Sequence, residues 1–473
     1  MTRRFLFLLL SGFLCCSKAI AVAAPVEWVR ASIDDDVSWS GEIALTQSVV
    51  VSPNGTLRIL PGTKIRVPAG KGISLSVSGR LSIDGGGGSD AVLFLPEKPR
   101  GARDQWEGIR LIAGEKGPTV LSGFRLEGAR EGVAVSEADV TIRDAVFSGC
   151  ETGVRGNQKS RVVVDNCLFD GNGNGAIVSL GGEGAFLRSR FTNIQGNGIV
   201  ADKGASFRVT ACAFERGKTG IFSLTNAPCR VEDSSFASLE VGVVARQIGK
   251  ESAVSRCEFR NNGTGLLAIQ FSTVEVSDST FRENMAGVDA KEFSAPSVRH
   301  NRFEANQVAV NLFRKSHAVV EKNVFFHNRD AVVVNYSSYP RITGNNFDRN
   351  DMSVRLEKFQ SGDWEERSGS REISGGEASK RGSQFAAIAG TQAKFPRRVY
   401  ARGNHWGPDP ERNPEKGTLG KIRDGKKYGP VRYEGFGDGE YAIDVVDFAE
   451  ELPSPAPDAG PRKNGSARPL EAK

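Results

Sequence analysis

The sequence is poor in the residues that build metal centres and membrane spans. Its 473 residues include only 4 His and 3 Met, which leaves little material for a copper site made from clusters of those side chains. After an apolar run at 5–14, no segment approaches the roughly 20 apolar residues that a membrane-spanning helix needs. We therefore expect neither a metal centre nor a membrane span in the mature chain.

An excess of one charge is also lacking. The chain has 62 Lys and Arg residues against 56 Asp and Glu residues. The net charge falls from +6 to +3 without residues 1–23, which hold Arg3, Arg4 and Lys18 and no acid. This balance gives no basic face for nucleic acid. We expect no nucleic-acid partner, and the charge does not require an acidic polymer as ligand.

The N-terminus has the pattern of a secretory signal. Arg3 and Arg4 precede the apolar run, and Ala21-Val22-Ala23 supplies the small residues of a cleavage site. We predict a signal peptide at 1–23 that is cleaved near Ala23. The mature protein is therefore expected in the periplasm or outside the cell.

A phenylalanine recurs through the middle of the chain at steps of 22 or 23 residues. A fixed period of this size is typical of a stacked repeat, in which each unit buries its apolar face only against the next unit. Five positions before each phenylalanine from Phe147 on stands an apolar residue, from Ile142 to Ile342. The recurring phenylalanines are Phe124, Phe147, Phe169, Phe191, Phe214, Phe236, Phe259, Phe281, Phe303, Phe325 and Phe347.

Short β-branched runs between Gly, Asn, Ser or Asp turns predict an all-β solenoid, a single-stranded parallel β-helix of about 14 coils of 22–23 residues. Neighbouring coils would lie about 4.8 Å apart, so equivalent side chains would stack into columns. Three positions after the phenylalanine, one column keeps asparagine over five coils, and stacked amides can satisfy buried polar groups. These ladder residues are Asn262, Asn284, Asn306, Asn328 and Asn350.

Five cysteines remain after signal cleavage. Three of them, Cys167, Cys212 and Cys257, occupy one column on every second coil. Two coils would place their Cα atoms about 9.6 Å apart, beyond the roughly 7 Å that a disulfide allows. We therefore interpret all five cysteines as small buried side chains rather than metal ligands or disulfide partners.

The pattern of Val or Ile, Asn, Phe, Asn, Gly and an aliphatic residue resembles the repeat of the pectin-lyase-like right-handed β-helix superfamily over residues 120–356. The segment Gly403-Asn404-His405-Trp406 is similar to the one that closes many secreted members. The resemblance implies a right-handed helix but no particular activity, because this scaffold hosts lyases, hydrolases, epimerases, adhesins and periplasmic accessory proteins. One such accessory protein, which acts in nitrous-oxide reductase maturation, is similar to this chain in the repeat alone.

The repeat also divides the chain into segments. A cap near 25–50 would close the N-terminal end, and the Pro-, Ala- and Lys-rich C-terminus would be flexible. The predicted segments are a signal peptide (1–23), an N-terminal cap with opening coils (24–119), regular repeats (120–356), a polar excursion (357–397), a closing coil with a C-terminal cap (398–450) and a flexible tail (451–473).

Enzyme signals are faint. The paired aspartates with Gly-His-Gly of polygalacturonases and the Asp-Pro-His-Glu of mannuronan epimerases are both missing from the sequence. One turn column carries Asp278, His300 and Lys322, which could abstract a proton from a uronic acid. Alternating charges in that column fit a surface ion-pair ladder better. We assign no catalytic residue and no cofactor, and keep a calcium-assisted polysaccharide lyase or uronate epimerase that uses these three residues as the alternative.

An apolar column eight positions after the phenylalanine should face outward by strand alternation. A strip of this kind marks a contact, either with part of the excursion 357–397 or with a partner. Aromatic residues at turns, with polar neighbours, would suit a glycan-binding groove. The predicted binding residues are Ile177, Ile199, Phe222, Val244, Leu267, Phe271, Phe293 and Tyr336.

These observations together predict a secreted or periplasmic, non-catalytic β-helix scaffold. Its expected partner is a cell-envelope polysaccharide or protein. The sequence leaves open which of the two it is, and also the oligomeric state.

Overall fold

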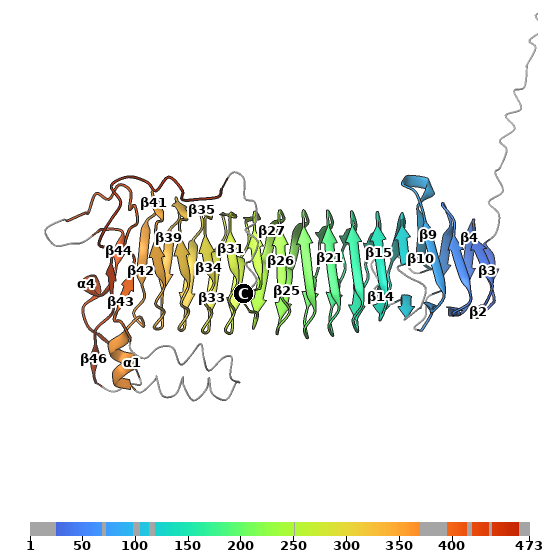
Figure 1. Cartoon of the computed structure of the whole chain (residues 1–473), viewed down its shortest axis with the longest axis horizontal. Coiled ribbons are helices and arrows are strands. Elements are labelled where there is room, and N and C mark those ends of the chain that lie inside the picture. Colours follow the sequence, from blue (N-terminus) through green and yellow to red (C-terminus); the bar gives the residue numbers. More distant parts are fainter. Residues whose placement is uncertain are drawn as a thin grey trace, which may run out of the picture.

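The computed structural model describes residues 25–68, 72–97, 105–112, 119–249, 251–368, 395–413, 419–434 and 438–462. The chain winds into a long rod of stacked coils that runs from the blue N-terminal end to the red C-terminal end (Figure 1). Nearly every strand pair in these ranges is parallel, the exception being β45 (Val431–Arg432) with β46 (Glu440–Tyr441). The prediction of an all-β parallel β-helix of about 14 coils is confirmed.

A full coil contributes strands to three faces of the rod. The first face is a 16-stranded sheet. Its strands are β3 (Asp36–Trp39), β6 (Thr56–Ile59), β9 (Arg80–Asp84), β12 (Thr119–Ser122), β15 (Asp139–Arg143), β18 (Arg161–Asp165), β21 (Glu183–Leu187), β24 (Ser206–Thr210), β26 (Cys229–Glu232), β28 (Ala253–Ser255), β31 (Glu275–Ser277), β34 (Ser297–Arg299), β37 (Val319–Glu321), β40 (Arg341–Thr343), β43 (Arg398–Tyr400) and β47 (Val445–Asp447).

The second face carries the recurring phenylalanines. Its strands are β1 (Val26–Trp28), β4 (Glu42–Leu45), β7 (Lys64–Val67), β10 (Val92–Pro96), β13 (Phe124–Glu127), β16 (Val146–Ser148), β19 (Leu168–Asp170), β22 (Arg190–Thr192), β29 (Glu258–Arg260), β32 (Thr280–Arg282), β35 (Arg302–Glu304), β38 (Val324–Phe326) and β41 (Asn346–Asp348).

The strands of the third face begin near the small residue that comes about six positions after each phenylalanine. Two long strands, β25 (Ala213–Leu224) and β27 (Ser235–Arg246), bend from the second face into the third. The other strands of the third face are β2 (Ser32–Ile33), β5 (Val49–Val51), β8 (Ser74–Val77), β11 (Gly108–Ile112), β14 (Glu131–Ser136), β17 (Thr152–Asn157), β20 (Asn174–Val178), β23 (Asn197–Ala201), β30 (Thr264–Ile269), β33 (Ala286–Lys291), β36 (Val308–Phe313), β39 (Asp330–Val334), β42 (Met352–Leu356) and β44 (Ile422–Arg423).

A stack of phenylalanine rings forms the centre of the core. Phe259 and Phe281 are fully buried, and their ring centroids lie 4.5 Å apart with nearly parallel planes. The stack runs from Phe147 to Phe347. A glycine packed beside it, such as Gly265, has little room for a side chain, because a Cβ there would lie 2.7 Å from the Phe281 ring. Apolar surface is thus buried only between coils, as the period predicts.

Phe124 does not belong to this column. Leu126, not Phe124, pairs in register with Phe147, and Phe124 pairs with Val92 instead. The Phe124 ring meets Phe147 edge-on at 5.6 Å. The step of 23 residues is therefore accidental here, because the strand register and not the spacing decides which residues stack.

The asparagine ladder is confirmed. The backbone N–H and Nδ2 of Asn262 both donate to Oδ1 of Asn284, each at 3.0 Å, and Nδ2 also donates to the carbonyl of Phe236. A second ladder continues from Asn301 and Asn323 upstream through serines and cysteines. Buried polar groups at these turns are thus paired coil by coil, which removes a desolvation cost of about 1–3 kcal/mol for each group.

The five cysteines are buried and reduced, as predicted. Cys167 and Cys212 take ladder positions, where their backbone N–H groups donate to Ser189 and Ser234 at 3.1 Å. Burial raises the pKa of the Cys167 thiol to about 12 and that of Cys212 to about 11. The thiols therefore remain protonated at neutral pH.

The two ends of the rod are closed differently. At the N-terminal end, residues 25–50 are not a separate cap but the first strands of the helix, and Trp28 packs edge-on against the buried Trp39 at 5.2 Å. At the C-terminal end, Asn404 accepts from Asn345 at 2.9 Å and the Trp406 ring stacks on Phe347 at 4.8 Å. The closing segment therefore adds one coil to the stack of phenylalanine rings and one coil to the second asparagine ladder.

Among the described residues, the C-terminal region adds the short helices α1 (Gly362–Ser368) and α4 (Gly425–Tyr428) to the last coils. Part of the predicted excursion, 369–394, lies outside the described residues, and so does the signal peptide. The prediction of a flexible tail is wrong for residues 451–462. These residues lie against earlier coils, where Asp278, Lys322 and Asn346 bind them, and the red segment runs back past β41 and β35 in Figure 1.

Candidate functional site

The predicted apolar column lies on the third face, with one residue corrected. Ile177 pairs in register with Val200, not with Ile199, and Val200 continues to Phe222. Ile199 points into the core and is fully buried. The outward column is therefore Ile177, Val200, Phe222, Val244 and Leu267, and we refer to it as the apolar column.

The misplacement of Ile199 has a local cause. Gly175 follows Phe169 by six residues, whereas Gly198, its partner in the next coil, follows Phe191 by seven. The extra residue lies in the turn before β23, because the backbone N–H of Asn197 bonds to the side chain of Asn174. A fixed offset from the phenylalanine therefore fails in this coil.

Charged and polar pairs border the apolar column. At one end Asp289 accepts from Nδ2 of Asn311 at 2.8 Å and pairs with Lys291 at 2.8 Å. At the other end Arg155 pairs with Glu131. Between them, the column spans four coil steps, or about 19 Å at the strand spacing of a sheet. The result is an aliphatic strip with polar ends on a regular surface.

The predicted aromatic binding residues differ in how exposed they are. Phe271 is only 4% exposed, because the Phe293 ring stacks on it at 5.1 Å, so Phe271 is not an exposed platform as predicted. Tyr336 is partly exposed and lies between Phe313 and Phe359, at 4.9 Å and 4.7 Å. The row formed by Phe313, Tyr336 and Phe359 is the better aromatic surface.

The predicted charged turn column is present. Two adjacent members of the column form an ion pair between coils, whereas Asp278 and Lys322 form ion pairs outside the column. Arg256 donates from Nε and Nη2 to the two carboxylate oxygens of Asp233, at 2.7 and 2.9 Å. Asp278 and Lys322 instead contact residues near the C-terminus. All these turn residues adopt a left-handed conformation, with φ between 51° and 56° for Asp278, His300 and Lys322.

Arg462 binds the carboxylate of Asp278. Its backbone N–H and Nε donate to Oδ1 at 3.1 and 2.8 Å, and its Nη2 pairs with Oδ2. Partial burial raises the pKa of Asp278, but the hydrogen bonds and charge of Arg462 outweigh it and hold the pKa below its usual value. The carboxylate is therefore ionised and engaged.

His300 and Lys322 meet the same segment. Lys322 Nζ lies 2.7 Å from Oδ2 of Asp458, and His300 Nδ1 lies 3.1 Å from the Asp458 carbonyl. The N–H of Gly460 donates to the Lys322 carbonyl at 2.8 Å. The three residues of the proposed enzyme site are thus covered by residues 452–462, which we call the C-terminal strap.

The sequence of the C-terminal strap suits this role. It reads Leu-Pro-Ser-Pro-Ala-Pro-Asp-Ala-Gly-Pro-Arg, and proline favours an extended chain and removes N–H groups that would need partners. The remaining donors include Leu452, Ala456 and Gly460, whose N–H groups bond to Asn404, Asn346 and Lys322. The alternating prolines were the sequence signal for a docked segment, whereas the overall composition of this region suggested a flexible tail.

A buried polar cluster fixes the C-terminal cap. The carboxylate of Asp444 accepts from Tyr339 Oη at 2.9 Å, Gln360 Nε2 at 3.0 Å and the N–H of Gly362 at 2.8 Å. Burial raises the pKa of Asp444 to about 6, although these hydrogen bonds oppose the rise. Nearby, Lys315 Nζ pairs with the buried Glu365 at 3.1 Å. Sequence reasoning missed this cluster, because its members are far apart in the chain.

Metal ligands do not converge in the described ranges, where no group of three or more His, Cys, Asp or Glu side chains could hold a metal ion. His317 accepts from the N–H of Tyr339, and His405 contacts the Leu452 carbonyl. None of the helices described is long and apolar enough to span a membrane.

Two family models match the chain. Residues 107–250 match the model described as "Right handed beta helix region", and residues 182–411 match the model described as "Periplasmic copper-binding protein (NosD)". No curated protein matches. Among solved structures, the GH136 lacto-N-biosidase from Eubacterium ramulus is 11% identical over 63% of this chain and 61% of that chain, with a TM-score of 0.23.

Proposed function

Because this chain is a right-handed parallel β-helix repeat protein, we propose that it is a non-catalytic scaffold outside the cytoplasm that binds a protein of the cell envelope. The contact surface is the apolar column on the third face. Stacked coils give a surface of fixed spacing, since each coil is held by ring stacking and amide ladders to the next. A binding surface on such a rod needs little ordering when a partner arrives.

The apolar column is the observation that carries this proposal. It is aliphatic apart from Phe222. Four of its side chains are partly exposed, and Val244 between them is buried by its neighbours. Apolar strips of this length mark contact surfaces in soluble proteins. An aliphatic strip offers few hydrogen-bonding groups to a sugar, and a protein face with its own apolar side chains complements it better.

A polysaccharide is the second candidate ligand. The observation that favours it is the partly exposed row of Phe313, Tyr336 and Phe359. Aromatic rings combine a large apolar face with a polar edge, which suits the faces of sugar rings. This row lies near the C-terminal cap, away from the apolar column.

The enzyme alternative has less support. A base that abstracts a proton must reach the substrate, yet Asp278, His300 and Lys322 all contact the C-terminal strap. Incubation with uronic-acid polymers, followed by detection of unsaturated products, tests this alternative. Product formation that is abolished by Lys322→Ala would replace the scaffold proposal with a lyase.

Export rests on the sequence and on one family description. The basic residues and apolar run before Ala23 support a signal peptide, and the description of the model that matches 182–411 contains the word periplasmic. We propose a periplasmic or extracellular location. N-terminal sequencing of the protein recovered from the periplasm or medium tests both the location and cleavage near Ala23.

The partner is tested by crosslinking from the apolar column. A photoreactive residue at Phe222 should give a specific adduct with an envelope protein, whereas the same residue at Val50, an exposed valine of the third face, should not. Leu267→Asp should weaken binding of the purified partner about tenfold, as expected for loss of an interface anchor, while Val50→Asp leaves it unchanged. Equal adducts from both positions, or adducts only with residues 369–394 of the same chain, would refute the proposal.

A further inference from the structure

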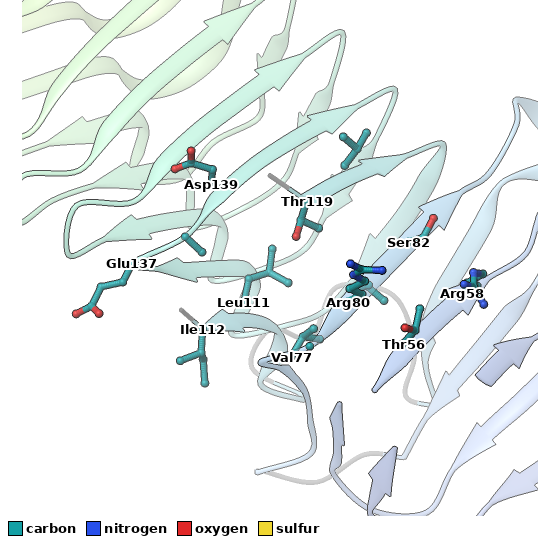
Figure 2. A pocket seen from close by; sticks show the side chains of 14 residues that line it. Thr56, Arg58, Val77, Arg80, Ser82, Leu111, Ile112, Thr119, Glu137 and Asp139 are labelled. Carbon is teal, nitrogen blue, oxygen red and sulfur yellow. The ribbon is translucent and has the colours of Figure 1, made fainter. Parts of the chain in front are cut away.

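A second surface lies at the other end of the rod and is unrelated to the apolar column. A hollow of about 610 Å³ opens where the third-face strands β8 and β11 approach the first-face strands β6, β9, β12 and β15. This volume is in the range of ligand sites, about 300–1,000 Å³. Figure 2 shows the lining side chains.

Charges are separated along this hollow. Arg58 and Arg80 lie on neighbouring strands, where Thr56 pairs in register with Arg80 and Arg58 with Ser82. Glu137 and Asp139 lie at the opposite side, and Figure 2 shows them well apart from the two arginines. Two coil steps separate the strand of Arg80 from that of Asp139, or about 9.6 Å.

Apolar side chains lie between the two charged ends. Ile112 is 47% exposed and Val120 is 48% exposed, which is unusual for large apolar residues of this chain. Leu111 and Val77 continue the apolar surface, and the hydroxyls of Thr56, Ser82 and Thr119 lie beside it. The hollow thus offers an anion-binding end, an apolar middle with hydroxyl groups, and an acidic end.

The two arginines are placed to bind an anion, because their existing ion pairing is weak. Arg58 pairs with Asp36 at 3.5 Å, and both side chains are at least half exposed. Such exposed pairs contribute little to stability, about 0–1 kcal/mol. A hydrogen bond from Thr56 lowers the pKa of the exposed Asp36, and Arg58 and Arg80 together lower it further. An arriving carboxylate or phosphate could likewise accept forked hydrogen bonds from their guanidinium groups.

We propose that this hollow binds an anionic saccharide about two rings long. Its carboxylate or phosphate lies at Arg58 and Arg80, the face of a sugar ring lies on Ile112 and Val120, and hydroxyl or amino groups lie at Glu137 and Asp139. The separation of about 10 Å between the strands of Arg80 and Asp139 matches two linked sugar rings. A neutral saccharide lacks the group that the arginines bind.

Binding of purified disaccharides to the full chain tests this site, measured by calorimetry or saturation-transfer NMR. The probes are a hexuronate disaccharide, a phosphorylated disaccharide and a neutral disaccharide, so that the carboxylate and phosphate sources are distinguished. Arg58→Gln and Arg80→Gln should each weaken the charged probe about tenfold, the effect of losing one charge-assisted contact. Arg208→Gln, an exposed arginine of β24 on the same sheet, should leave affinity unchanged.

The acidic end has its own test. Asp139→Asn and Glu137→Gln should weaken a saccharide with a free amine more than its N-acetylated counterpart, because only the amine is cationic. Any of three results would overturn the proposal. Neither charged probe binds saturably, or the neutral probe binds as tightly as the charged probes, or Arg58→Gln and Arg80→Gln leave the affinity for the charged probes unchanged. Leu267→Asp should keep full saccharide affinity, so failure here is distinguishable from failure of the proposed protein contact.

Discussion

Arg462 and Asp278 are 184 residues apart in sequence, yet they share two hydrogen bonds at 2.8 and 3.1 Å and an ion pair. The contact joins the end of the C-terminal strap to a coil in the middle of the rod. Lys322 and Asn346 hold the strap between these points. The strap therefore ties the closing coil back to earlier coils.

Arg462→Ala should release this end of the strap. Loss of the contacts with Asp278 lowers the free energy of local opening by about 1–2 kcal/mol, so limited proteolysis after residue 450 should become about tenfold faster. Arg282→Ala is the matched control, because Arg282 forms an exposed pair with its neighbour Glu283. Equal cleavage rates in both variants would show that the strap is not held at this point.

The same contact should depend on pH. The pKa of Asp278 is held below its usual value, so its stabilising contribution is present above the unfolded pKa of about 3.9 and is lost as the pH falls below it. Proteolysis of the strap by pepsin-like enzymes should therefore rise steeply below about pH 4. An Arg462→Ala variant should lack this pH step.

Asp444 predicts the opposite pH dependence for the C-terminal cap. Burial raises its pKa to about 6 in the folded state, so protonation favours folding, and stability is lost as the pH rises from about 4 through 6. Asp444→Asn should flatten this part of the profile in hydrogen exchange of the Gly362 amide. The carboxamide oxygen can still accept from the N–H of Gly362, and its Nδ2 can donate to the Tyr339 hydroxyl. Gln360 loses its acceptor, because its own Oε1 accepts from the N–H of Ser338. A wild-type profile without a change between pH 4 and 6 would contradict the assignment.

Asn306→Ala should be among the most costly substitutions in the ladder. The N–H and Nδ2 of Asn284 both donate to Oδ1 of Asn306, and these buried donors would lose their acceptor. A destabilisation of about 2–3 kcal/mol is expected in urea unfolding. Asn311→Ala, which removes an outward amide that donates to Asp289, should cost less than about 1 kcal/mol.

The register correction predicts unequal effects at two adjacent residues. Ile199→Asp places a carboxylate in the core, where Ile199 is fully buried, and should destabilise by about 3–5 kcal/mol or prevent folding. Val200→Asp changes an outward side chain and should cost less than about 1 kcal/mol. Thermal unfolding of the two variants decides the register, and a larger loss for Val200→Asp than for Ile199→Asp would restore the original assignment.

Cysteine labelling tests the buried column. Burial raises the pKa of the Cys257 thiol to about 12 and that of Cys229 to about 11, and thiols that remain protonated react slowly. The native mature protein should therefore resist a thiol reagent, and the denatured protein should expose five reactive groups. Rapid labelling of the native protein, or fewer than five groups after denaturation, would contradict this arrangement.

Particular residues show how far sequence reasoning reached. The column from Ile142 to Ile342 and the ladder from Asn262 to Asn350 stack as the spacing predicted, because the same offset recurs in coil after coil. Ile199 and Phe124 were misassigned where one turn or one strand has a different length. Spacing is reliable only while every turn keeps its length.

The candidate sites were harder to predict. Phe222 and Leu267 face outward as expected, but Phe271 is buried under a neighbouring ring. The hollow at Arg58 and Arg80 carries no repeat signal. Its lining comes from β6, β8, β9, β11, β12 and β15, and the lining residues come together only when the coils are stacked.

The sequence alone determined the parallel β-helix, because its period forces equivalent residues to lie about 4.8 Å apart and only stacking buries the recurring apolar side chains. Only the tertiary structure decided where the C-terminal strap lies, which carboxylate it occupies and how the cap encloses Asp444. Those contacts join residues with no common period, so their partners follow from how the chain returns along the rod and not from any local pattern.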